Sequence, residues 1–329
     1  MIKRIHLWLA GLLVVQIVAG VLVFWPRRTA AGNGQPLLPA LSAETVTELT
    51  VEDTAGASVR LAQVDGAWVL PDVGDYPANI TTVDNALKLL ADLTTGRVVA
   101  RTEASHRQLQ VAEDNFVRRV DLKTAEGAYT LFVGSSPSYG LTHVRVAGQT
   151  EVYAASQINS WDLPTQPDGW VNTVYLSVPE DTLRRVTVEN ANGAFTLESG
   201  QSEDEEGEAA TTWTLADLAE DEEMSASAVL TLVNQATSVN MTTPLGREEQ
   251  EEYGLAEPRA TVTLEGNDGE TITLLVGALD ATTNTAVVKA SNSPFYVRVA
   301  SYYLDKLVDF TRDSLLQTAE TEAETGAEE

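Results

Sequence analysis

The side chains that most often carry catalysis or bind metals are few in this sequence. It contains three histidines, His6, His106 and His143, and no cysteine. His6 lies in an apolar segment. The other two belong to no pattern such as His-Glu-x-x-His, whose spacing brings two imidazoles to one zinc ion. We therefore expect neither a zinc site nor thiolate chemistry, and we interpret His106 and His143 as surface histidines.

Serine and carboxylate chemistry is not indicated by residue spacing either. The segment GSSPS at 134–138 lacks the last glycine of a nucleophile elbow, and the corresponding GALD at 277–280 lacks the serine, so both are interpreted as turns after strands. The acidic runs at 203–208 and 221–223 lack the alternating order of a calcium loop. We expect no catalytic, metal-binding or cofactor-binding residue, although 48 acidic side chains leave a two-carboxylate hydrolase as a further alternative.

Two other binding chemistries are considered and set aside. Trp68, Trp161, Trp170 and Trp213 could offer sugar-stacking faces, but Trp68 and Trp213 occupy equivalent positions in a repeat described below, which favours packing in a core. The Gly-x-Gly at 32–34 follows no strand, so nucleotide binding is not expected.

The composition is that of an acidic chain able to fold. Its 329 residues carry 21 basic and 48 acidic side chains, a net charge of −27. Such a surface repels phosphate backbones, so we expect no nucleic acid as a partner. The lack of cysteine excludes disulfides.

An apolar segment near the N-terminus is typical of a membrane span. In residues 5–25 only His6 and Gln16 are polar, and a helix of this length spans about 30 Å, the thickness of a bilayer core. A cleaved signal peptide is the alternative, although its apolar region is usually shorter. We expect a single-pass anchor in the cell membrane, in contact with the lipid bilayer, with residues 1–4 cytoplasmic and the main body extracytoplasmic.

An internal repeat follows a Pro- and Gly-containing linker at 26–40. Four segments recur in the same order: TVED at 50–53 as TVEN at 187–190, WVLPD at 68–72 as WTLAD at 213–217, VAE at 111–113 as LAE at 255–257, and TLFVG at 130–134 as TLLVG at 273–277. We expect two tandem homologous domains, 41–170 and 171–312. The second carries an acidic insert at 199–210 and is followed by a disordered acidic tail at 313–329.

Each expected domain combines short strands with helices. Val83, Leu87 and Leu90 fall on one face of a helix, and residues 225–236 give its counterpart. Further helices are predicted from Ser156 to Leu163 and from Ser301 to Leu307. Hairpin-length connections suit antiparallel pairing. The expected fold class is α+β: an N-terminal transmembrane helix followed by two tandem domains with mainly antiparallel sheets and packed helices.

The sequence resembles a bacterial family known as domain of unknown function 4340. The resemblance rests on the apolar N-terminal segment, on WVLP at 68–71 before the first helix, and on YGLAEP at 253–258 before paired strands that end at Gly277. It extends over residues 45–310 in both copies, although LQVAED at 109–114 departs from the motif. It implies membrane-anchored proteins without assigned chemistry, some of them associated with ABC-type export systems or with gliding-motility-like auxiliary components.

The expected function is therefore that of a non-catalytic, membrane-anchored extracytoplasmic binding or scaffold protein. The resemblance suggests an auxiliary component of an ABC-type export system, with transporter subunits as partners. The alternative is an anchored protein that binds a small molecule or glycan between its two domains, because ligand sites favour domain interfaces. A pocket there, lined by polar and aromatic side chains, would favour this alternative.

Overall fold

The computed structural model describes residues 34–203 and 209–317. In these two ranges no helix combines the length and the apolar character needed to cross a bilayer. The predicted anchor, residues 5–25, and the tail at 1–4 lie outside the described residues. The prediction of a single-pass membrane protein therefore has no support in the structure, and we withdraw it together with the cell-membrane localisation.

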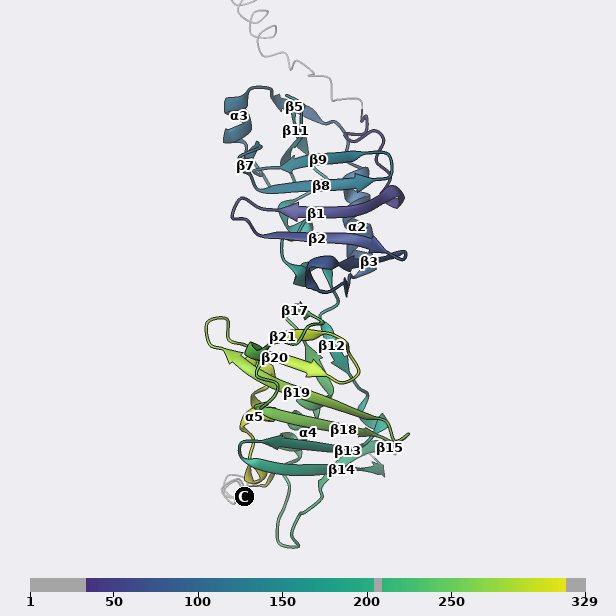
Figure 1. Ribbon diagram of the computed structural model, residues 1–329, viewed down its shortest axis with the longest axis vertical. Helices are drawn as coiled ribbons and strands as arrows, with labels where there is room; N and C mark the ends of the chain where they lie inside the picture. Colours follow the sequence, from purple (N-terminus) through teal and green to yellow (C-terminus); the bar gives the residue numbers. More distant parts are fainter. Residues whose placement is uncertain (1–33, 204–208, 318–329) are drawn as a thin grey trace, which may run out of the picture.

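The first half of the chain builds a nine-stranded antiparallel sheet (Figure 1). Most neighbours in this sheet are joined by hairpins, whereas β1 also pairs with the distant β8. The strands lie in the order β4 (Tyr76–Pro77), β3 (Ala67–Leu70), β2 (Ser58–Val64), β1 (Val46–Glu52), β8 (Arg118–Thr124), β9 (Ala128–Val133), β10 (Thr142–Val146), β11 (Val152–Ala155) and β5 (Arg97–Ala100).

The second half builds an eight-stranded antiparallel sheet. Its order is β15 (Ala209–Leu215), β14 (Gly193–Glu203), β13 (Leu183–Asn190), β18 (Ala260–Gly266), β19 (Thr271–Asp280), β20 (Thr285–Ala290), β21 (Tyr296–Ala300) and β17 (Thr243–Gly246). The eight strands of the first sheet from β3 to β5 are connected in the same way. Their two long-range pairs, β1–β8 and β11–β5, correspond to β13–β18 and β21–β17, and the other neighbours are joined by hairpins. The homology of the two halves stays a prediction from the sequence.

Two short ribbons complete the strands. They are β6 (Val111–Ala112) with β7 (Asn115–Phe116), and β12 (Val174–Ser177) with β16 (Ser238–Asn240). Every pair of described strands is antiparallel, as expected.

The fold class is mainly β, which corrects the predicted α+β class. Strands make up 43% of the described residues and helices 22%. Of the segments predicted as helices after the last hairpins, Ser156 to Leu163 is reduced to the short η3 (Ser160–Asp162), whereas Ser301 to Leu307 is helical in two short pieces, η7 (Ser301–Tyr303) and α5 (Asp305–Asp309). In the first half, Pro164 and Pro167 prevent a longer helix because proline lacks the N–H and restricts the residue before it.

Two longer helices cover the sheets, as predicted. Helix α2 (Ile80–Ala91) packs on the first sheet and α4 (Ala226–Thr237) on the second (Figure 1). Asn79 Oδ1 accepts hydrogen bonds from the N–H groups of Thr81 and Thr82, which satisfies the free donors at the start of α2. The other helical segments are α3 (Glu103–Gln108), η1 (Ala43–Thr45), η2 (Pro71–Val73), η4 (Pro167–Trp170), η5 (Glu180–Thr182), η6 (Glu251–Tyr253) and η8 (Arg312–Leu315).

A single cluster of buried apolar side chains extends through both halves, from Leu37 to Leu315. Leu37 and Leu38 belong to it, and the Leu37 N–H donates to the Leu93 carbonyl at 2.7 Å. The predicted linker at 26–40 is therefore packed in its last part, and the folded body begins before residue 41. Residues 26–33 lie outside the described part of the chain.

The acidic segments are also more ordered than predicted. Strands β14 and β15 extend into the predicted insert at 199–210, of which residues 204–208 lie outside the description. In the predicted tail, Leu315 is buried and the Gln317 N–H donates to the Glu223 carbonyl. The packed chain thus continues to residue 317, and 318–329 are outside the described residues.

Arg312 links the C-terminal segment to the loop before α4 and should make stability depend on pH. Its guanidinium lies 2.6 Å from Glu222 and 2.9 Å from Asp217, and the hydrogen bonds from Arg312 lower the pKa of Glu222 to about 2. A carboxyl group with a depressed pKa stabilises the folded state above its unfolded pKa, about 4.3, and this contribution disappears as the pH falls to about 2.

We therefore expect Glu222→Gln to lower the melting temperature at pH 7, with a difference from the wild type that shrinks steadily below about pH 4.3. Thermal unfolding at pH 7, 4 and 3 measures it, and Glu220→Gln is the control. A difference that does not change with pH would contradict the role of Arg312.

Candidate functional site

Ser135 and His143 contact each other, although no sequence motif pairs them. Ser135 Oγ lies 3.1 Å from His143 Nδ1 and 3.1 Å from the Leu109 carbonyl oxygen. His143 is buried and not on the surface as predicted, and this burial lowers its pKa. No carboxylate of the described residues is hydrogen-bonded to the ring, so the pair lacks the group that orients histidine in a serine triad.

The remaining residues considered in the sequence are dispersed. Trp68 and Trp213 are buried, as predicted, and so is Trp170, whereas Trp161 is 66% exposed, so no shared stacking surface forms. Gly277 lies inside β19 and not in a turn. Within 34–203 and 209–317, no group of three or more His, Asp or Glu could hold a metal ion.

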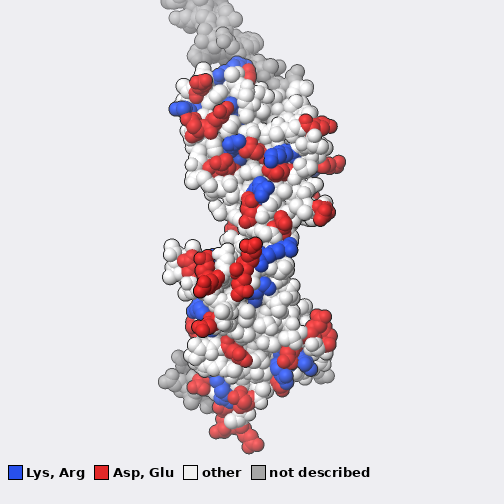
Figure 2. All heavy atoms as spheres, in the orientation of Figure 1, with Lys and Arg blue, Asp and Glu red and all other residues white. Residues whose placement is uncertain are grey.

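The two halves meet at a narrow junction (Figures 1 and 2). The Tyr76 and Phe295 rings pack at a centroid distance of 4.5 Å, and the Arg247 guanidinium lies 4.7 Å from the centre of the Phe295 ring. Arg247 Nε donates to the Gly74 carbonyl at 2.9 Å. Aromatic packing and a charged hydrogen bond thus fix the sheets to each other.

Gly74 permits the close approach at this junction. Its φ of +71° is left-handed, and a Cβ there would lie 3.0 Å from the backbone nitrogen of Arg247. A side chain would separate the halves at this point. The segment from Pro71 to Ala78 therefore lies directly against the second half.

A hollow of about 350 Å³ lies on one side of that segment. It is lined by three aromatic rings, Tyr76, Tyr175 and Phe295, and by polar groups that include Asn172 and Asn292. Tyr175 Oη donates to the Phe295 carbonyl at 2.6 Å and accepts from the Ala290 N–H at 3.0 Å, so the structure satisfies this hydroxyl.

Tyr76 differs from Tyr175 because the described residues offer its hydroxyl no hydrogen bond. The side chain is 8% exposed and lines the hollow. Burial raises the pKa of Tyr76 to about 12, so the phenol is a neutral donor at pH 7. A second hollow of about 530 Å³, lined by Asp72, Asp75 and Arg247 among others, lies against residues 71–75 of the same segment.

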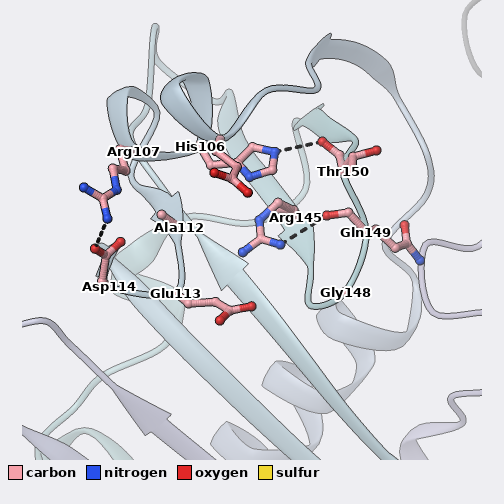
Figure 3. A pocket seen from close by; sticks show the side chains of 10 residues that line it. His106, Arg107, Ala112, Glu113, Asp114, Arg145, Gly148, Gln149 and Thr150 are labelled. Carbon is pink, nitrogen blue, oxygen red and sulfur yellow. Dashed lines mark hydrogen bonds and ion pairs between the residues drawn. The ribbon is translucent and has the colours of Figure 1, made fainter.

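A third cavity, of about 340 Å³, lies at the end of the first sheet that is far from the junction (Figures 1 and 3). Helix α3, the β6–β7 turn and the β10–β11 turn form its walls. His106 is buried there, contrary to its predicted surface position, and its Nε2 lies 2.8 Å from the Thr150 carbonyl oxygen. Arg107 and Asp114 form an ion pair at the rim.

Arg145 is the central group of this cavity. It is 5% exposed, its Nε donates to the Val111 carbonyl at 2.7 Å, and its Nη1 donates to the Gln149 carbonyl at 3.1 Å. The guanidinium lies 4.7 Å from the centre of the Phe132 ring. Burial lowers the pKa of Arg145 and the nearby Glu113 raises it, yet an arginine stays charged at neutral pH.

Sequence reasoning missed Arg145, Tyr76 and the junction residues. Arg145 sits in an alternating strand with no motif around it, and Tyr76 follows a turn. A buried arginine in the THVRV strand is visible in the sequence only as a charge between two apolar residues, a weak signal.

Comparison with known proteins yields one finding. The family model described as Domain of unknown function (DUF4340) matches residues 68–239. No curated protein and no solved structure matches the chain. The match runs from β3 across the junction to β16, whereas the YGLAEP segment at 253–258 lies outside it.

Proposed function

The chain belongs to the family described as Domain of unknown function (DUF4340), and we propose from its junction that it is a non-catalytic binding protein holding a small polar ligand, a glycan, between its two sheets. The observation that carries the proposal is the Tyr76 side chain, which lines the junction hollow and whose hydroxyl has no hydrogen-bond partner among the described residues.

The lining suits a sugar. The Tyr76 hydroxyl opens on the hollow and can donate to a ligand hydroxyl, a hydrogen bond that contributes about 0.5–1.5 kcal/mol. Asn172 and Asn292 add amide groups that both donate and accept, and aromatic rings can pack against the apolar face of a sugar. The hollow, about 350 Å³, lies at the lower end of the range for small-ligand sites.

The rigid frame supports the same proposal. Tyr76, Arg247 and Phe295 connect the two sheets on one side of the hollow, so its walls are held before a ligand arrives. A preformed site loses less conformational entropy on binding than a flexible one. This arrangement favours recognition of a ligand over a surface role alone.

The test is an immobilised glycan array probed with the full chain, followed by titration of each bound glycan. We expect Tyr76→Phe to weaken binding about tenfold, because it removes one hydrogen bond to the ligand and keeps the ring packing on Phe295. Tyr253→Phe is the matched control, since Tyr253 is buried in a separate cluster away from the hollow.

Two outcomes would contradict the proposal: no glycan bound above background, or an unchanged affinity in Tyr76→Phe. In either case a scaffold role for other proteins, with ABC-type transporter subunits as partners, becomes the better proposal. Affinity purification after brief crosslinking would then show whether permease or ATPase subunits are enriched.

A further inference from the structure

Arg145 is a buried charge whose hydrogen-bonding capacity is only partly used. Nε and Nη1 each donate to a backbone carbonyl, but no described residue accepts from Nη2. No carboxylate of the described residues forms an ion pair with the guanidinium. Nη2 is not shielded from solvent, so it opens on the cavity, where a guanidinium edge with free N–H donors suits a carboxylate. In Figure 3 the guanidinium projects between Glu113 and Gln149 into the cavity.

Comparison with the second sheet indicates that Nη2 is not needed to stabilise the turn after β10. The strand register makes Lys289 in β20 the equivalent of Arg145 in β10, because the preceding residues, Val288 and Val144, pair with the equivalent residues Val276 and Val133. Lys289 Nζ donates to the carbonyls of Ala290 and Ser293 at 2.8 and 2.6 Å, and it lines none of the three cavities described above. A simple ammonium thus holds the equivalent turn, whereas Arg145 directs a further donor into a cavity.

The other charges around the cavity restrict the ligand. Its lining contains three carboxylates, from Glu103, Glu113 and Asp114, against the two guanidinium groups of Arg107 and Arg145. Arg107 and Asp114 neutralise each other at the rim. Glu103 and Glu113 remain beside Arg145 and would repel a simple anion, but they would attract a positive group attached to it.

We propose that this cavity binds a small amphoteric molecule of the amino-acid class. Arg145 binds its carboxylate, and Glu113, supported by Glu103, binds its ammonium group. The volume of about 340 Å³ suits a ligand of this size. The site lies at the opposite end of the first sheet from the junction, so the two proposals succeed or fail separately.

The experiment titrates the full chain with L-glutamine, and with acetate and methylammonium as carboxylate-only and ammonium-only probes, using saturation-transfer NMR and calorimetry. We expect L-glutamine to bind at least tenfold more tightly than either single-charge probe. Glu113→Gln, an exposed change, should weaken L-glutamine binding at least tenfold. Arg145→Lys should weaken it equally and still fold, because lysine serves the same turn in the second sheet.

Lys289→Arg is the matched control and should leave L-glutamine binding unchanged, as should Tyr76→Phe at the junction. The proposal is overturned if L-glutamine shows no binding up to about 10 mM, where even weak ligands become detectable. It is also overturned if acetate binds as tightly as L-glutamine, or if Glu113→Gln binds L-glutamine with wild-type affinity.

Discussion

Replacing Gly277 by alanine is expected to destabilise the protein by at least about 2 kcal/mol, because a Cβ at this position has no space. It would fall on the carbonyl oxygen of Tyr253 and lie 2.9 Å from Leu255 Cδ2. Gly277 lies within β19 directly after Val276, which pairs with Ala260 and Val288, so a shift of the strand away from the η6 turn would disturb both neighbouring strands.

Urea titration followed by far-UV circular dichroism measures this effect. Gly134→Ala should behave alike in the first sheet, because its Cβ would meet the Leu109 carbonyl oxygen. Gly127→Ala is the control: nothing lies within 4 Å of its Cβ, so the change should stay within about 0.5 kcal/mol. Similar free energies of unfolding for Gly277→Ala and Gly127→Ala would show that β19 and η6 can separate at little cost.

The close approach of Gly277 to the Tyr253 carbonyl gives a structural reason for two sequence segments that occur together, YGLAEP at 253–258 and TLLVG at 273–277. Gly254 has a φ of +63° and ends η6, which presents the Tyr253 carbonyl to β19. In the first half Gln110 adopts φ +57° at the corresponding place, next to Leu109 and opposite Gly134. The departure from the motif there changes the side chain and keeps the backbone conformation, at the energetic cost that a non-glycine residue has in this region.

Features that depend on local sequence were predictable. The stripe of Val83, Leu87 and Leu90 and the segment at 225–236 correspond to α2 and α4, because a helical face is encoded within a few turns. Alternation and short turns likewise indicated antiparallel hairpins. The helix expected from Ser156 to Leu163 is reduced to η3, since a capping serine and a few apolar residues do not overcome the nearby prolines, whereas the segment expected from Ser301 to Leu307 is helical in η7 and α5.

The candidate sites could not be predicted because their residues meet through long-range contacts. Arg247 and Gly74 are far apart in the chain, and so are Tyr76 and Phe295. Arg145 becomes distinctive only when the β10–β11 turn, β6 and α3 surround it and leave one nitrogen facing a cavity. Hydrophobic periodicity records which face of a strand is buried, and it does not record which polar group on that face lacks a partner.

Trp170→Ala should be the most destabilising of the changes considered, because Trp170 fills the core where the halves join. The side chain is fully buried, and its Nε1 donates to the Pro164 carbonyl at 2.9 Å. Its own carbonyl accepts from the Asn79 N–H at 2.7 Å, so the residue holds the start of α2 next to the junction. Removing a buried tryptophan costs about 3–5 kcal/mol, and the Pro164 carbonyl would also lose its donor.

Trp161→Ala provides the matched comparison, since it deletes the same side chain from an exposed position nine residues earlier in the chain. Trp161 is 66% exposed, and its removal should change the free energy of unfolding by no more than about 0.5 kcal/mol. Urea titration of both variants under identical conditions makes the measurement. Because a continuous core connects the sheets through Trp170, its loss should also weaken their coupling, so that far-UV circular dichroism and the fluorescence of Trp68 and Trp213 no longer report one common transition. A single transition with near wild-type stability in Trp170→Ala would mean that the sheets are held together by Tyr76, Arg247 and Phe295 alone.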